Sequence, residues 1–202
     1  MSISADEVKK LREMTGAGMM DCKKALTETA GDVDKAVDVL RTKGLAGLEK
    51  RAGRVTKEGV VESYIHSTGK IGVLVEIDCE TDFVARSDDF RSFAHDVAMQ
   101  IAAAQPQYVT RDQVPEDVLA HERGVFEAQA KESGKPEKVV GKIIDGKMEK
   151  LFEAICLLEQ PFIKDGDTKV ERLLGGLAAK VGENIEIRRF TRFEVGAALA
   201  EE

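Results

Sequence analysis

Histidine and cysteine are the side chains that most often hold a metal ion or act as nucleophiles, and the chain has three of each. They are His66, His95, His121, Cys22, Cys79 and Cys156. The histidines belong to three different predicted elements and lack the spacing of zinc ligands. The cysteines form no CxxC pair, and none has an adjacent histidine. We therefore expect no metal site, and buried thiols in a reducing compartment instead of disulfides.

Other catalytic and cofactor-binding patterns are missing as well. The sequence has no glycine-rich loop ending in GK[ST] and no GxSxG elbow. The Gly16-Ala17-Gly18 cluster has neither a preceding strand nor a third glycine, so it is no dinucleotide fingerprint. Carboxylates are plentiful, but no catalytic pair stands out. We expect no direct nucleotide binding, no cofactor and no enzymatic activity.

Two methionines at the start of a helix favour a docking role. Met19 and Met20 are neighbours, and adjacent helical residues point about 100° apart. One could help to fill a core, but a small helical head can hardly bury both. We expect at least one to be exposed, where a flexible and polarisable side chain suits a contact surface.

The segment around Asp82 and Phe83 is a second docking candidate. It follows a predicted strand and precedes a helix cap at Ser87, so we expect a surface loop. Phe83 could pack on the following helix as a hydrophobic staple. The alternative is a wedge whose ring enters an apolar pocket of a partner while the Asp82 carboxylate competes for groups nearby.

These residues lie in a chain that reads as a small helical head followed by a larger core. Residues Ser4 to Glu7 have the form of a capping box, which predicts a first helix that ends at the glycines near residue 16. A second helix is expected from Met19 to about Thr29. The third has a cap at Asp32, apolar residues at helical spacing and a stop at Gly44. Residues 1–45 form this head, which we expect to gain stability from a partner.

A basic stretch follows the head. Six cations against one carboxylate lie between residues 41 and 57: Arg41, Lys43, Lys50, Arg51, Arg54 and Lys57. No aromatic residue is interleaved for stacking on bases, so a solvated linker over residues 46–57 is favoured over an RNA-binding patch.

Residues 58–202 have the pattern of an α+β core. Two strands, Val61–Ile65 and Ile71–Ile77, flank a turn at residues 67–69, and apolar residues alternate in the second. Amphipathic helices are predicted after Ser87 and from Val170, with a helical hairpin whose helices begin near Pro115 and Pro136. A strand is expected near Leu157 and Leu158, and a last one from Ile185 to Phe193.

The composition places the chain in a broad class. A formal net charge of −7 argues against general nucleic-acid binding. No apolar run is long enough to span a bilayer, and the first residues do not resemble a signal peptide. We expect a cytoplasmic protein without a membrane or nucleic-acid partner.

Four stretches, in order, resemble the signatures of bacterial elongation factor Ts. They are Leu11-Arg12 with Thr15-Gly16-Ala17-Gly18-Met19-Met20 and residues 21–26, Thr81-Asp82-Phe83-Val84-Ala85, Leu158-Glu159-Gln160-Pro161-Phe162, and Gly182-Glu183-Asn184-Ile185 with Arg188-Arg189-Phe190. The resemblance implies a head like a ubiquitin-associated domain and an α/β core with an antiparallel sheet and a helical hairpin. It also implies guanine nucleotide exchange on elongation factor Tu, the GTPase that brings aminoacyl-tRNA to the ribosome in protein biosynthesis.

The resemblance further implies roles for individual residues. Arg12, Met19 and Met20 dock on a helix of the GTPase domain, and His66 is a contact near the phosphate loop. The segment of Thr81, Asp82, Phe83 and Val84 displaces the magnesium ion, with Phe83 between switch-region helices. Longer members of the family carry two cores, one with a Tyr-x-His strand and one with the Asp-Phe segment. This chain has both in one core, so a homodimer is expected, as in the short members.

Two other functions are compatible with the sequence. The head could bind a helix of another protein as an adaptor without affecting a nucleotide, or residues 41–57 could bind RNA.

Overall fold

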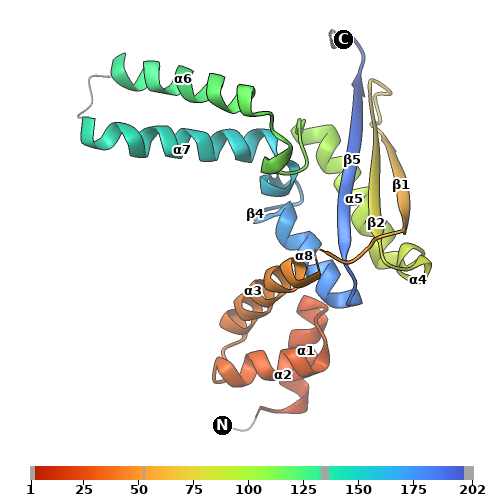
Figure 1. Cartoon of the computed structure of the whole chain (residues 1–202). Helices are drawn as coiled ribbons and strands as arrows, with labels where there is room; N and C mark the ends of the chain where they lie inside the picture. Colours follow the sequence, from red (N-terminus) through yellow and green to blue (C-terminus); the bar gives the residue numbers. More distant parts are fainter. Residues whose placement is uncertain (1–2, 52, 133–136, 198–202) are drawn as a thin grey trace. The chain divides into compact units, whose positions relative to one another are not determined.

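The computed structural model describes residues 3–51, 53–132 and 137–197, in which helices alternate with short runs of strands (Figure 1). The fold is α+β, as predicted, with one three-stranded and one two-stranded sheet in the described residues. The chain divides into two compact units, residues 1–99 with 171–202, and residues 100–170. This division separates the helical hairpin and not the head, so the predicted partition into head, linker and core stays a prediction.

The first helix, α1 (Ala5–Thr15), begins with the predicted capping box. The Glu7 N–H donates to Ser4 Oγ at 3.2 Å, and the Ser4 N–H donates to the Glu7 carboxylate at 2.7 Å. The helix ends at Gly16, whose φ of 68° is left-handed and suits a residue without a Cβ. Local sequence therefore sets both ends of α1.

Helices α2 (Met19–Glu28) and α3 (Val33–Arg51) complete the head. The Asp32 carboxylate accepts the Lys35 N–H at 3.1 Å, which confirms the predicted cap of α3. The three helices share one small apolar core. Its buried members are Val8, Leu11, Cys22, Ala25, Leu26, Ala36 and Leu40.

The predicted stop at Gly44 is wrong, because α3 continues for two further turns to Arg51. A Cβ at Gly44 would lie 3.3 Å from the carbonyl oxygen of Gly175 in α8 (Val170–Val181). The glycine therefore permits a close approach of two helices and does not end one. As a result, residues 46–51 of the predicted linker are helical.

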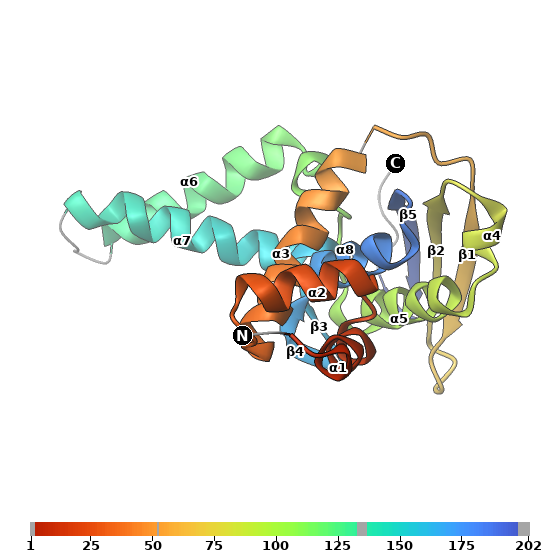
Figure 2. The same cartoon turned by 90° about the horizontal axis from the view of Figure 1, so that it is seen from below.

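The larger sheet has the strand order β1-β2-β5 and is antiparallel throughout. Its strands are β1 (Glu58–Ile65), β2 (Ile71–Cys79) and β5 (Ile185–Glu194), and the turn between the first two has Gly69 at a φ of 67°. Val73, Val75 and Ile77 are buried on one face, as their alternation predicts. Helix α5 (Asp88–Ala104) runs along the sheet (Figures 1 and 2) and buries the predicted stripe that includes Phe90 and Val97.

The second unit contains the predicted helical hairpin of α6 (Glu116–Glu132) and α7 (Glu137–Ile155). The two helices lie antiparallel (Figure 1) and share a core of Ala130, Ile144 and Met148. The predicted connection at residues 133–135 and Pro136 lies outside the described residues.

The strand predicted near Leu157 and Leu158 does not include these two residues and lies slightly later in the chain. Residues Leu157–Glu159 form a 3₁₀ turn, and the short strands follow it as β3 (Pro161–Phe162) and β4 (Asp165–Lys169). The N–H groups of Leu157 and Leu158 donate to Tyr108 and Val109 at 2.9 and 3.1 Å. The turn itself is made by two local bonds, from the Glu159 N–H to the Cys156 carbonyl at 3.0 Å and from the Gln160 N–H to the Leu157 carbonyl at 3.2 Å.

Among the described residues, no helix combines the length and the apolar character that a membrane crossing needs.

Candidate docking site

The Asp82 and Phe83 segment is a single helical turn, so the expected surface loop is wrong in its backbone. Helix α4 (Asp82–Ala85) follows an N-cap at Thr81, whose hydroxyl accepts the Val84 N–H at 3.4 Å. The Ala85 N–H donates to the Thr81 carbonyl at 3.2 Å. Threonine as a cap and aspartate in the first turn both favour this short helix.

The four predicted residues of this segment have different surroundings. The Phe83 ring is 82% exposed, so it does not pack as a hydrophobic staple on the helix that follows. Asp82 is exposed and forms an ion pair with Arg86 at 3.1 Å. Val84 is only 5% exposed and anchors the turn to the core. The segment therefore presents an aromatic ring and a carboxylate, while Val84 faces inward.

The entry into α4 is bound to the turn between α8 and β5. The Glu183 carboxylate accepts the backbone N–H groups of Glu80 and Thr81, each at 3.1 Å, and the Thr81 hydroxyl at 2.6 Å. Sequence reasoning missed this contact, since more than a hundred residues separate its partners. The only signal was that Glu183 lies in a stretch similar to a family signature.

Two further groups at this junction have shifted pKa values. The Asn184 N–H donates to the Glu80 carboxylate at 2.6 Å and lowers its pKa, and Arg54 adds to this effect. Burial raises the pKa of the Cys79 thiol to about 11, and the Glu183 charge contributes to the rise. The thiol is therefore protonated at neutral pH, and it donates to the Thr81 carbonyl at 3.2 Å.

The head places its predicted docking residues on its surface. Arg12 is exposed on α1, and both methionines are exposed at the start of α2, Met19 by 46% and Met20 by 63%. The prediction that at least one methionine is exposed is confirmed, and it holds for both. Met20 also lines a groove of about 390 Å³ whose other walls are Lys23, Lys24, Thr27 and Glu28.

His66 lies far from α4 within the same chain. It follows β1 at the turn to β2, where Tyr64 Oη lies 3.1 Å from its Nδ1. Helix α4 follows the other end of β2, since Cys79 pairs with Glu58 and Gly72 pairs with Ile65. The length of β2 separates the two sites by roughly 25 Å. One chain therefore cannot bring His66 and Phe83 to one small site.

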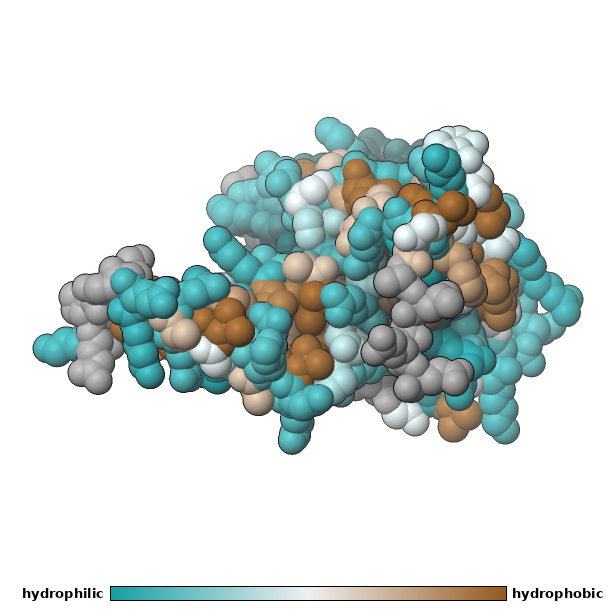
Figure 3. Space-filling model, turned by 90° about the horizontal axis from the view of Figure 1, so that it is seen from above, coloured by the Kyte–Doolittle hydropathy of each residue, from teal (hydrophilic) through white to brown (hydrophobic). Residues whose placement is uncertain are grey.

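The sheet face that is turned away from α5 carries exposed apolar side chains. Alternate residues along a strand share a face, and so do directly paired residues. The pairs Ser63↔Leu74, Ile65↔Gly72 and Gly72↔Phe193 therefore put Leu74, Ile65 and Phe193 on one face, together with Val61. All four are exposed. We call them the outer sheet patch. The view in Figure 3 shows hydrophobic residues exposed in several places among hydrophilic ones.

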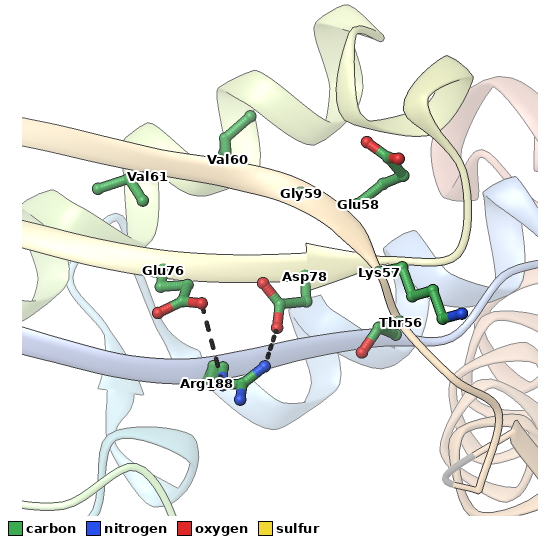
Figure 4. Close-up of a pocket in the computed structure, with 9 residues that line it drawn as sticks. All are labelled: Thr56, Lys57, Glu58, Gly59, Val60, Val61, Glu76, Asp78 and Arg188. Carbon is green, nitrogen blue, oxygen red and sulfur yellow. Dashed lines mark hydrogen bonds and ion pairs between the residues drawn. The ribbon is translucent and has the colours of Figure 1, made fainter.

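A polar pocket of about 540 Å³ lies at one end of that face (Figure 4). Glu76 and Asp78 on β2 point toward Arg188 of β5, which is the extra residue of a bulge in the strand pairing. The Arg188 guanidinium donates to Asp78 at 3.3 Å, and this bond, followed by the charge of Glu76, raises the pKa of Arg188. Both carboxylates are paired with the Arg188 guanidinium, so they do not resemble a catalytic pair.

The basic stretch is partly paired within the chain. Lys43 forms an ion pair with Glu28 at 2.9 Å, and Arg54 forms one with Glu80 at 3.2 Å. The Lys50 side chain lies outside the described residues. The paired cations fit a structural role better than a free RNA-binding patch.

Comparison with known proteins gives a consistent result. The family model described as elongation factor TS matches residues 3–197. The elongation factor Ts of Carboxydothermus hydrogenoformans is 60% identical over 198 residues, which cover 98% of this chain and 91% of that protein. Those of Syntrophomonas wolfei and Moorella thermoacetica are each 58% identical, and the alignments cover 99% and 98% of this chain and 94% and 98% of those proteins.

Proposed function

The chain belongs to the elongation factor Ts family, and from this premise we propose that it is the guanine nucleotide exchange factor of elongation factor Tu in translation. It binds the GDP form of the GTPase, displaces the magnesium ion and promotes release of GDP so that GTP can bind. The chain supplies contacts and no catalytic residue of its own, and it acts in the cytoplasm.

The observation that carries the proposal is the exposed Phe83 ring on a capped helical turn. A large aromatic ring that is left in water has no role in the fold of this chain, but it matches a partner's apolar pocket. Beside it, the Asp82 carboxylate can disturb a magnesium site, because it competes with the groups that hold the ion. Thr81 and Val84 complete the segment, one as the cap and the other as the anchor.

Exchange then follows from linkage. Magnesium neutralises the phosphates of the bound nucleotide, so its loss weakens GDP binding. Contacts of Phe83 that form only in the nucleotide-releasing arrangement of the GTPase shift its population toward that state. If the factor weakens GDP binding, GDP must weaken binding of the factor by the same ratio. The same reciprocity holds for GTP, so binding of GTP weakens binding of the factor and releases it.

The head supplies a separate contact. Arg12, Met19 and Met20 are exposed, and we assign them to a helix of the GTPase domain. Methionines adapt to irregular apolar surface, and the arginine adds a directional charged contact.

The outer sheet patch supports a homodimer. Val61, Ile65, Leu74 and Phe193 form an apolar set that soluble proteins usually cover, and a second copy would cover it with the same residues. A dimer also resolves the separation of His66 from α4, since the His66 of one protomer and the Phe83 of its partner can contact the same GTPase. Leu74→Asp should lower the mass in solution from two chains to one, while Val139→Asp, on the exposed face of α7, should leave it unchanged.

Release of a fluorescent GDP from elongation factor Tu tests the function directly. Substoichiometric amounts of the protein should accelerate release in the presence of excess unlabelled GDP, and excess magnesium should reduce the acceleration. A release rate that does not change on addition of the protein would exclude the proposed function. Binding of the GTPase without faster release would point instead to an adaptor.

A further inference from the structure

The α4 turn is too short to hold its own shape. It has four residues, and isolated helices of this length are unstable in water because nucleation fixes several dihedral angles for each hydrogen bond gained. The exposed Phe83 ring makes no contribution to holding the turn in place. The orientation of the turn, and with it that of the Phe83 ring, must therefore be set by the groups that bind the turn to the rest of the fold.

Glu183 is the main polar tether. Its carboxylate accepts three hydrogen bonds from the two residues that precede α4, at 3.1, 3.1 and 2.6 Å. Hydrogen bonds to a charged acceptor are shorter and stronger than those between neutral groups. The bond from the Thr81 hydroxyl also fixes the rotamer of the cap, whose oxygen accepts the Val84 N–H.

A further bond holds the same two segments together, and another joins the α8–β5 turn to the chain before β1. The Glu80 carboxylate accepts the Asn184 N–H at 2.6 Å, and the Asn184 side-chain amide donates to the Arg54 carbonyl at 3.2 Å. The Glu183 carboxylate thus accepts from the backbone of Glu80, and the Glu80 carboxylate accepts from the backbone of Asn184, the residue that follows Glu183. Gly182, with a φ of 80°, allows the chain to reverse after α8, so that Glu183 faces the end of β2.

We propose that Glu183 is a positioning residue for nucleotide exchange: it fixes the start of α4 so that Phe83 and Asp82 meet the GTPase in one orientation. This inference rests on the proposed function. Glu183 itself acts through Thr81 and makes no contact with the GTPase.

The test compares three single variants in the fluorescent GDP assay. Glu183→Ala removes all three acceptor bonds and should slow the maximal exchange rate about tenfold. Glu183→Gln keeps one amide oxygen that can accept the two N–H groups, so it should lose only about twofold to threefold. Glu186→Ala removes an equal charge from an exposed position on β5 and should exchange at the rate of the unmodified protein.

A double variant separates positioning from general damage. If Glu183 acts through Phe83, then Phe83→Ala with Glu183→Ala should exchange no more than about twofold slower than Phe83→Ala alone. Multiplied losses would overturn the inference. Circular dichroism and the thermal midpoint verify that Glu183→Ala is folded. If Glu183→Ala does not fold, Glu183→Gln takes its place in the comparison with Phe83→Ala.

The outcomes for the two proposals differ. If the unmodified protein does not accelerate GDP release, the proposed function fails and the inference fails with it. If it does, but Glu183→Ala exchanges at the same rate, the function stands and the positioning role is overturned.

Discussion

The two proposed docking regions of this molecule are built in opposite ways. The methionine surface of the head lies on α2, which shares a core with two other helices, and its exposed side chains are flexible. The α4 surface is one turn with an aromatic ring, and the residues before the turn donate hydrogen bonds to the distant Glu183 carboxylate. The difference fits two tasks. A surface that only supplies affinity can adapt to its partner. A side chain that shifts the partner between two states must be held in place, because its effect depends on contacts made in only one of the partner's states.

The largest expected effect is on the wedge itself. Phe83→Ala should slow the maximal rate of GDP release about thirtyfold, the size of loss expected for a buried aromatic hot spot. Because the ring is exposed in the free protein, the thermal midpoint should stay close to that of the unmodified chain. A variant that exchanges at the original rate would show that Phe83 is not the wedge.

The methionine pair should instead affect affinity. Met19→Ala combined with Met20→Ala should raise the concentration of factor needed for half-maximal exchange about tenfold, with the maximal rate preserved. Titration of the factor against a fixed amount of GTPase separates these two quantities. Met14→Ala, an exposed methionine on α1, is the matched control. A loss of maximal rate in the double variant would show that the methionine pair, like Phe83, acts on the rate and not only on affinity.

A smaller effect is expected at the cap of the wedge. Thr81→Ala removes the N-cap oxygen and one bond to Glu183, which should slow the maximal rate about fivefold, as expected from a cap loss of about 1 kcal/mol. Thr81→Ser keeps the hydroxyl and should restore most of the rate. If Ser and Ala behave alike, the hydroxyl does not hold the turn.

The smallest effect concerns the ion pair beside the wedge. Arg86→Ala frees Asp82 from a pair whose partners are both exposed, so exchange should change by less than about twofold. Arg91→Ala, on the exposed face of α5, serves as the control. A large loss would mean that Arg86 contacts the GTPase directly.

Much of the fold could be predicted because its signals are local. The capping box at Ser4, the left-handed Gly16 and the alternation through Val73 and Val75 all appear where the sequence indicated them. The errors came from positions where a distant segment decided the outcome. Gly44 by its type predicts a helix stop, yet it permits the close approach of Gly175, and Leu157 lies in a turn beside Tyr108 and not in a strand.

The candidate site divides in the same way. Residue types and spacing predicted that at least one methionine of the pair is exposed, and they left Phe83 as either a staple or an exposed wedge; the structure shows the ring exposed. The helical backbone of the Asp82 segment, the inward position of Val84 and the separation of His66 from α4 did not follow from residue types and spacing. Each of these depends on strand register and on contacts across the chain, which a local pattern does not contain.

The sequence by itself contains no recognised catalytic motif and predicted two surface groups suited to a partner, because residue type, caps and periodicity act over a few neighbours. Only the tertiary structure decided which of those groups is bonded to a distant part of the chain. The tether from Glu183 to Thr81 joins residues 102 positions apart, so it exists only once β2 and β5 have paired.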